Sequence, residues 1–184
     1  GELAFRDCDN LRTVDLSNLS LTAIKVETFY NCDNLETVSL PQSVVAIEAR
    51  AFENSQKLEN IDLSQLKLTT LEEDAFYGCK MIAKVDLSKS SLTSIANHVF
   101  YGISSLKEVI LPETITSIGE SAFCGCPIET INFPSNLTQI GNNAFRENRI
   151  SDLSFPESLT TIGDGALAGA TNYTITIGNT VTSI

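Results

Sequence analysis

The sequence Leu106-Lys107-Glu108-Val109-Ile110-Leu111-Pro112, continued by Ile115-Thr116-Ser117-Ile118 and Ala122-Phe123, recurs along the chain. The most regular position of the motif is its last one, which is Phe in all repeats but the last and returns at intervals of 24, 23, 24, 24, 23, 22 and 22 residues. The residues at this position are Phe5, Phe29, Phe52, Phe76, Phe100, Phe123, Phe145 and Leu167. A fixed period of this length indicates a solenoid, in which each repeat packs on its neighbours.

Within each repeat, the apolar positions change their spacing. Val109 and Leu111 are two residues apart, which is the period of a β-strand. Ile115 and Ile118 are three residues apart, which we interpret as a corner of the chain. The Ala-Phe pair follows where one short helical or 3₁₀ turn would place it. The pattern predicts one short strand and one helical turn in each repeat, and neither can bury its apolar face alone.

Two variants of the repeat alternate irregularly. One has a proline after the strand, where the missing N–H ends the hydrogen-bonded ladder, and the other reads Asp-Leu-Ser with one extra residue. The prolines are Pro41, Pro112, Pro134 and Pro156, and the aspartates are Asp15, Asp62 and Asp86. The sequence shows no linker, so we interpret residues 1–184 as a single solenoid of about eight repeats of 22–24 residues, a window of a longer array.

The run from Leu106 to Cys126 resembles the BspA-type leucine-rich repeat, and near-copies of this run cover the whole chain. The resemblance implies an α/β fold, namely a right-handed leucine-rich-repeat solenoid with a parallel β-sheet on its concave face and short helical or 3₁₀ turns on its convex face. Such repeats are typical of surface or secreted proteins of certain bacteria and protozoan parasites, with adhesion as their usual proposed role. The resemblance therefore implies a cell-surface or extracellular location and a non-enzymatic protein-binding or adhesion function.

The composition disfavours several other classes of protein. The net charge of −11 and the scattered basic residues argue against nucleic acid as a partner. No apolar run approaches the roughly 18 residues of a membrane helix, so we predict no membrane insertion. The single histidine, His98, has no partners of a catalytic triad, and phosphate-binding loops are absent, so we predict no enzyme and no cofactor. The sequence contains no Cys-x-x-Cys pair, and we predict no metal site.

The cysteines are interpreted as buried thiols. Five is an odd number, which disfavours a closed disulfide framework. Four of them (Cys8, Cys32, Cys79 and Cys126) lie three residues after the repeat Phe, where other repeats carry Ser55, Ile103, Asn148 and Ala170. A position that accepts Ser, Ile and Ala is typical of a small, mostly buried site, in which free Cys behaves as a small hydrophobe.

The strand residues between the apolar positions are expected to face solvent and to form columns along the sheet. We interpret the charged members of these columns as a binding face for a protein partner: Asp15, Asp62, Lys84, Asp86, Glu108 and Asp152. Adjacent strands lie about 5 Å apart, so Asp62 and Asp86 should be neighbours of like charge, with Lys84 close enough to offset them. The alternative is a polar face that only keeps the sheet soluble, with the aspartates serving the turn.

A second functional hypothesis is a structural spacer or building block of a larger assembly. Val181–Ile184 lead in register into Gly1–Phe5, so copies of the chain could stack end to end. Three Asn-x-Ser/Thr sequences, which begin at Asn18, Asn136 and Asn172, would accept N-linked glycans on a eukaryotic secretory route.

Overall fold

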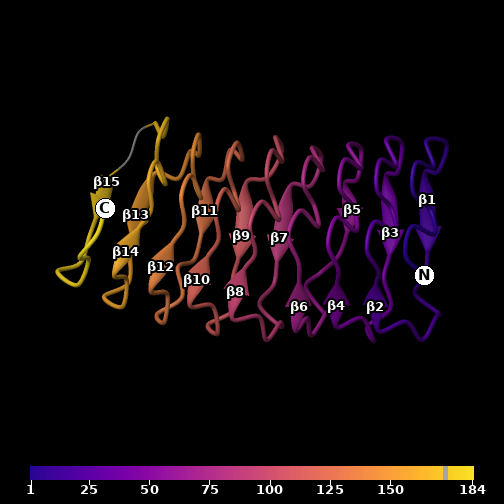
Figure 1. Ribbon diagram of the computed structural model, residues 1–184, viewed down its shortest axis with the longest axis horizontal. Coiled ribbons are helices and arrows are strands. Elements are labelled where there is room, and N and C mark those ends of the chain that lie inside the picture. The colour runs from indigo at the N-terminus through magenta and orange to yellow at the C-terminus, as the bar shows by residue number, and fades with distance from the viewer. Residues whose placement is uncertain (172–173) are drawn as a thin grey trace.

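The computed structural model describes residues 1–171 and 174–184, and it shows a solenoid of parallel strands (Figure 1). Each complete repeat contributes a strand to a first ladder, a two-residue strand to a second ladder, and a turn that carries the repeat Phe. The first ladder contains β1 (Thr13–Asp15), β3 (Thr37–Ser39), β5 (Asn60–Ile61), β7 (Lys84–Asp86), β9 (Glu108–Ile110), β11 (Thr130–Ile131), β13 (Asp152–Ser154) and β15 (Thr174–Thr176). The second ladder contains β2 (Ala23–Ile24), β4 (Ala46–Ile47), β6 (Thr70–Leu71), β8 (Ser94–Ile95), β10 (Ser117–Ile118), β12 (Gln139–Ile140) and β14 (Thr161–Ile162).

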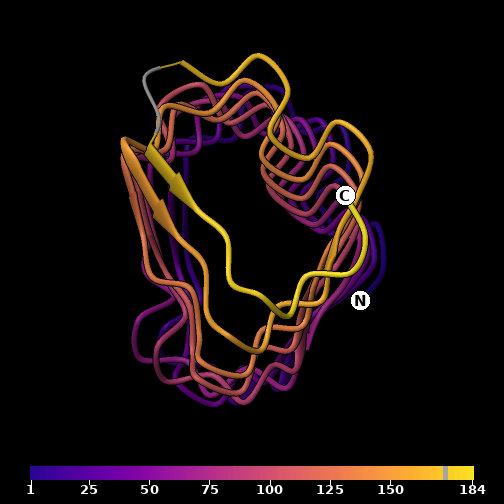
Figure 2. The ribbon, with the colours of Figure 1, turned by 90° about the vertical axis from the view of Figure 1, so that its left-hand side faces the viewer.

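The register of the ladders follows the apolar pattern of the sequence. Val38 pairs with Val14 on one side and with Ile61 on the other, so like positions stack and the apolar side chains share one interior. Viewed along the axis, the coils superimpose around this interior (Figure 2). The predicted solenoid of parallel strands is confirmed.

The prediction of one strand per repeat was incomplete, because the corner itself contains a second strand. Ser117–Ile118 in β10 pairs with Ser94–Ile95 in β8 and with Gln139–Ile140 in β12. A strand of two residues shows only one inward side chain, so the sequence offers no period of two that would reveal it.

The predicted helical or 3₁₀ turns are wrong, since the described residues contain no helix. Alternate residues of each turn donate in different directions: the Phe29 N–H donates to the Ala51 carbonyl in the next turn (2.8 Å), and the Thr28 N–H donates back to Lys25 (3.2 Å). Glu27, at the start of this turn, has a φ of 51°, which a right-handed helix does not contain. The turns therefore form a third hydrogen-bonded stack, along the axis, instead of helices.

The phenylalanine of each turn fills the interior. Neighbouring rings from Phe5 to Phe145 stack nearly parallel, with centroids 5.1–5.7 Å apart. Rings from Phe29 onward are fully buried, and offset stacking of this kind adds to the stabilisation that burial alone supplies.

The cysteine column has a role that its sequence pattern did not reveal. Cys32, Cys79 and Cys126 are buried, as predicted, while Cys8 is only half-buried. Each of the three buried thiols contacts the carbonyl oxygen of the preceding repeat's Phe at 3.0 Å, and the Ser55 hydroxyl donates to the Phe29 carbonyl at 2.7 Å. Where this column carries Cys32, Ser55, Cys79 or Cys126, its side chain therefore also donates a hydrogen bond to the preceding repeat.

Both ladders are interrupted between the third and fourth repeats, at a boundary that we call the seam. In the described residues, no strand pairing joins β5 to β7 or β6 to β8. Strands β5 and β6 belong to one coil, and β7 and β8 belong to the next (Figure 1). The turn stack continues across the seam, where the Phe76 N–H donates to Val99 at 2.9 Å and the Gly78 N–H donates to Tyr101 at 2.8 Å. The first ladder is also divided between β11 and β13, but the second ladder is continuous there.

The seam lies where two Asp-Leu-Ser repeats follow one another, which happens nowhere else in the chain. These two repeats place Leu66 and Ser90 at the same buried position. A large apolar side chain therefore stacks next to a small polar one, and the Ser90 hydroxyl has no hydrogen-bond partner. The mismatch leaves the seam less well packed than boundaries between repeats that carry like side chains.

Candidate functional site

A groove of about 770 Å³ lies over the seam on the first ladder. Residues of β3, β5 and β7 line it, together with the segments that follow β3 and β5. Asp62, Lys84 and Asp86 are among the lining residues. The structure thus brings together three of the six residues that the sequence assigned to a binding face.

Each aspartate of the groove stabilises the turn that follows its strand, by accepting a hydrogen bond from a backbone N–H of that turn. One carboxylate oxygen of Asp62 accepts a hydrogen bond from the Ser64 N–H at 2.8 Å, and Asp86 accepts one from Ser88 at 3.0 Å. Burial acts to raise the pKa of Asp86, but the Ser88 hydrogen bonds and the charge of Lys84 outweigh it and hold the pKa below its usual value. The turn function considered from the sequence is therefore present at both aspartates.

Asp15 makes the same turn in the first repeat, outside the groove. It accepts a hydrogen bond from the Ser17 N–H at 2.9 Å, and the hydrogen bonds of the Ser17 side chain and backbone lower the pKa of Asp15. Asp15 pairs in register with Ser39 at the edge of the first ladder. It therefore shares the local geometry of Asp62 and Asp86 but not their surroundings.

Lys84 forms an ion pair with Glu108, and it does not pair equally with the two aspartates. Its ammonium group lies 2.8 Å from the Glu108 carboxylate, and this hydrogen bond raises the pKa of Lys84. Glu108 lies on β9 beyond the groove, in register with Lys84. The groove is consequently acidic, because Glu59 joins Asp62 and Asp86 in its wall while Lys84 is neutralised from outside.

Two further outcomes concern Asp152 and Glu59. Asp152 pairs in backbone register with Thr174, between β13 and β15, far along the ladder from the groove. Glu59 was not among the predicted site residues, although it directly precedes β5. The one sequence signal for this groove is the adjacency of the two Asp-Leu-Ser repeats.

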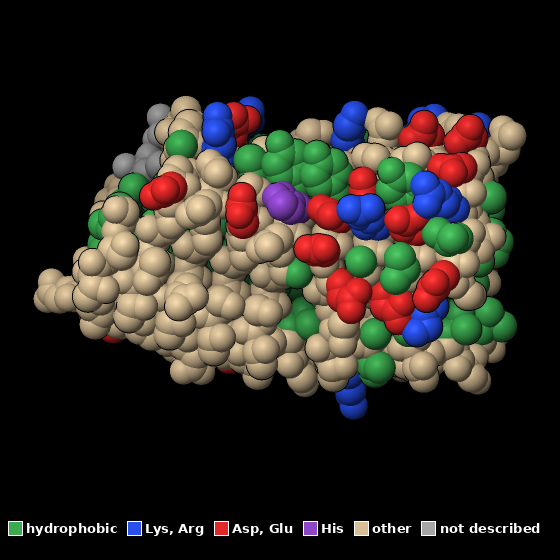
Figure 3. All heavy atoms as spheres, viewed as in Figure 1, with side chains coloured by type: hydrophobic (Ala, Val, Ile, Leu, Met, Phe, Trp, Pro, Cys, Tyr) green, Lys and Arg blue, Asp and Glu red, His purple; other side chains and the backbone are tan. Residues whose placement is uncertain are grey.

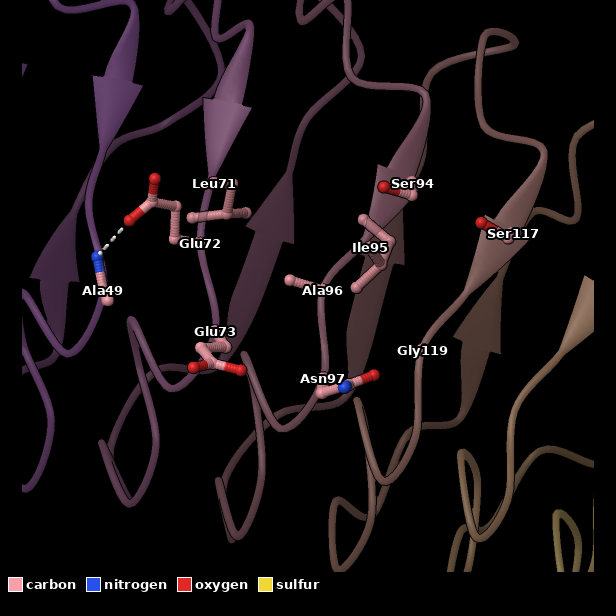
Figure 4. A pocket seen from close by; sticks show the side chains of 10 residues that line it. All are labelled: Ala49, Leu71, Glu72, Glu73, Ser94, Ile95, Ala96, Asn97, Ser117 and Gly119. Carbon is pink, nitrogen blue, oxygen red and sulfur yellow. Dashed lines mark hydrogen bonds between the residues drawn. The ribbon is translucent and has the colours of Figure 1, made fainter.

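A second groove, of about 580 Å³, opens at the seam on the second ladder. Figure 4 shows Leu71, Glu72 and Glu73 on one side of it, and Ser94 and Asn97 on the other. Glu72 accepts a hydrogen bond from the Ala49 N–H at 2.9 Å, and Asn97 accepts one from Glu120 at 2.9 Å. Both side chains therefore satisfy backbone amides of a neighbouring repeat.

Of the three Asn-x-Ser/Thr sequences, the structure describes the asparagine of two. Asn18 and Asn136 are exposed, and the Asn136 amide donates to the Glu113 carbonyl at 3.3 Å. Asn172 lies outside the described residues. The described part of the chain contains no helix long and apolar enough to cross a membrane.

The repeats and their stacking define a leucine-rich-repeat protein. The chain belongs to the BspA-type family: the model of the "BspA type Leucine rich repeat region (6 copies)" matches residues 1–91 and 69–184. Leucine-rich-repeat proteins are generally non-enzymatic and generally bind proteins or build repeat structures. No curated protein sequence matches the chain.

Solved bacterial structures share the fold. A leucine-rich repeat protein from Bacteroides ovatus is 24% identical, with a TM-score of 0.62, and the match covers 94% of this chain and 53% of that one. A leucine rich cell surface protein from Faecalibacterium prausnitzii is 26% identical (TM-score 0.58; 87% and 43% covered). The T. pallidum Leucine Rich Repeat protein is 27% identical (TM-score 0.63; 86% and 76% covered). The chain thus spans about half the length of the first two proteins.

Proposed function

We propose that this chain is a protein-binding or adhesion module of a cell-surface or secreted leucine-rich-repeat protein. Its partner binds over the first ladder, with the acidic groove at the seam as the centre of the contact. The observation that carries the proposal is the convergence of Glu59, Asp62 and Asp86 on one groove. The neighbour from F. prausnitzii, whose name places it at the cell surface, supports the location.

The charge of the groove indicates the chemistry of the partner. Carboxylates gathered along one groove attract a basic surface, which raises the rate of association and selects against acidic partners. The binding should therefore weaken as the salt concentration rises. The residues predicted outside the groove, namely Asp15, Glu108 and Asp152, lie on other strands of the same ladder, away from the proposed centre of the contact.

Asp-to-Asn substitutions separate binding from the turn function, because an asparagine side chain still accepts the turn hydrogen bond. The double variant Asp62→Asn/Asp86→Asn removes two charges from the groove, and Asp15→Asn is its matched control, since it alters the same turn outside the groove. Surface proteins captured by the immobilised wild-type chain would be identified by mass spectrometry, and their affinities for all three proteins measured by surface plasmon resonance. We expect the double variant to bind at least about tenfold more weakly and the control to bind normally. Unchanged binding by the double variant would exclude the groove.

A structural role is the second candidate, and the end faces of the solenoid favour it. Large apolar side chains are exposed on the outer faces of the first and last repeats, including Phe5 (38%), Leu19 (51%) and Ile177 (40%). Such faces fit further repeats of the same kind, either in a longer array or in a second copy stacked end to end. Analytical ultracentrifugation over a wide concentration range tests the stacking, and a monomer at every concentration argues against it.

A further inference from the structure

The turn face of the solenoid contains an arginine that is bound by residues of the next turn. The Arg6 guanidinium lies over the Tyr30 ring, 4.7 Å from its centroid. One of its nitrogens also donates to the Glu27 carboxylate. An aromatic face and a carboxylate thus hold one guanidinium group, which is the combination that cation–π and ion-pair chemistry favours.

The same arrangement of positions recurs at Tyr77, without the arginine. Tyr30 and Tyr77 both follow the repeat Phe directly, and Glu27 and Asp74 both precede it by two residues, with φ values of 51° and 57°. The residue that stands opposite Tyr77, where Arg6 stands opposite Tyr30, is Glu53. In the described residues, no cation lies over the Tyr77 ring.

The carboxylates around Tyr77 have basic neighbours only beyond hydrogen-bond distance, and these include His98, whose Nδ1 lies 3.7 Å from Asp74. Arg50 is the shared counter-ion of Glu27, Glu53 and Asp74, but it lies 3.6–3.7 Å from each of them, beyond hydrogen-bond distance, and its side chain is half-exposed. One carboxylate oxygen of Glu53 is buried and has no hydrogen-bond partner. Burial, followed by the charge of Asp74, raises the pKa of Glu53.

We propose that Glu53, Asp74 and Tyr77 bind the guanidinium group of an arginine on a partner protein. The partner's arginine takes the place that Arg6 occupies on Tyr30, and Arg50 turns outward to make room. A guanidinium suits the site better than an ammonium group, because its plane can lie on the ring while its nitrogens reach the carboxylates. The Tyr101 ring, which stacks on Tyr77 at 4.7 Å, holds that ring in place. Figure 3 shows this face, with acidic side chains on both sides of the single histidine, basic side chains close by, and an apolar patch beside it. The site lies away from the first-ladder groove, so it does not depend on the function proposed above.

The two turns allow a reciprocal test with a defined probe. The probe is the peptide acetyl-Gly-Arg-Gly-amide, and its control is the same peptide with citrulline, which is neutral and nearly isosteric. Binding is followed by NMR on the tyrosine ring signals, assigned with single Tyr→Phe variants. Glu53→Arg supplies the missing arginine from within the chain and should fill the site, whereas Arg6→Glu empties the site on Tyr30.

We expect the arginine peptide to shift the Tyr77 signals in a saturable manner, and the citrulline peptide to leave them unchanged. Glu53→Arg should reduce the affinity at Tyr77 by at least about tenfold, and Arg6→Glu should create a second saturable response at Tyr30. The proposal is overturned if the Tyr77 signals do not move, if both peptides move them equally, or if Glu53→Arg leaves the binding intact. Circular dichroism confirms that each variant is folded before it is titrated.

Discussion

The rings of Phe76 and Phe100 stack with their centroids 5.7 Å apart, the widest spacing in the column of buried rings. Outside them, on the same two turns, the rings of Tyr77 and Tyr101 are only 4.7 Å apart. Further across the solenoid, no strand pairing joins β5 to β7 or β6 to β8 in the described residues, although the Ser91 N–H still donates to the Leu68 carbonyl at 2.8 Å. The third and fourth repeats are therefore held together most closely on the turn face, at the tyrosines, and least at the ladders.

The seam should be visible in hydrogen exchange. Backbone amides without a ladder partner open more readily, so β7 and β8 should exchange at least about tenfold faster than their counterparts β9 and β10. Mass spectrometry of peptides that cover residues 82–97 and 106–120 measures the difference within one experiment. Equal protection of the two peptides would show that the seam is as firmly closed as the next boundary.

Replacing either of two buried serines with alanine should change the free energy of unfolding, but in opposite directions. Ser90→Ala removes a hydroxyl that has no partner, and we expect the free energy of unfolding to rise by about 1 kcal/mol. Ser55→Ala removes the hydroxyl that donates to the Phe29 carbonyl, and we expect it to fall by about 1 kcal/mol. Urea denaturation of both variants provides the measurement, and a destabilised Ser90→Ala would mean that its hydroxyl is satisfied in solution.

The turn aspartates should tolerate loss of charge but not loss of the acceptor. Asp62→Ala removes the oxygen that accepts from the Ser64 N–H, and we expect a loss of about 1 kcal/mol in stability. Asp62→Asn keeps an acceptor and should cost much less. Thermal denaturation of the pair tests this, and equal losses would show that the charge, not the turn hydrogen bond, is what the fold uses.

The buried thiols should make the fold sensitive to alkaline pH. Burial raises the pKa of Cys32 to about 11 and that of Cys126 to about 12, above the ordinary value of 9.0. Because the unfolded chain releases these protons first, the free energy of unfolding falls as the pH rises from 9 toward the folded-state values. The variant Cys32→Ser/Cys126→Ser keeps small donors that do not ionise there, so its stability should decline less between pH 8 and 10. Parallel pH profiles in urea denaturation would contradict this.

The sequence was sufficient for the features that depend on one repeat at a time. The spacing of Val109 and Leu111 and the return of the Phe every 22–24 residues determine the strands and the stacking. The turns were misread because residues such as Glu27 and Asp74 adopt a positive φ without being glycine. Their conformation is imposed by hydrogen bonds to the neighbouring turn, which no local pattern records.

The candidate sites depend on pairs of neighbouring repeats, and they were only partly predictable. Asp62 and Asp86 could be placed in one column from the repeat phase, but the groove beside them results from stacking two Asp-Leu-Ser repeats. The pairing of Lys84 with Glu108 instead of with an aspartate depends on side-chain rotamers. Likewise, the position of Glu53 opposite Tyr77 becomes informative only when it is compared with Arg6 opposite Tyr30.

The direction of the hydrogen bonds gives the seam a mechanical consequence. Backbone hydrogen bonds between repeats run along the solenoid axis, so tension applied between the two ends loads every boundary in series with the same force. The seam has no strand pairing in either ladder, so the turn stack and the Ser91–Leu68 hydrogen bond carry that load there. Under stretching, we expect the solenoid to open at the seam, into a block of three repeats and a block of five, before the paired boundaries on either side of it.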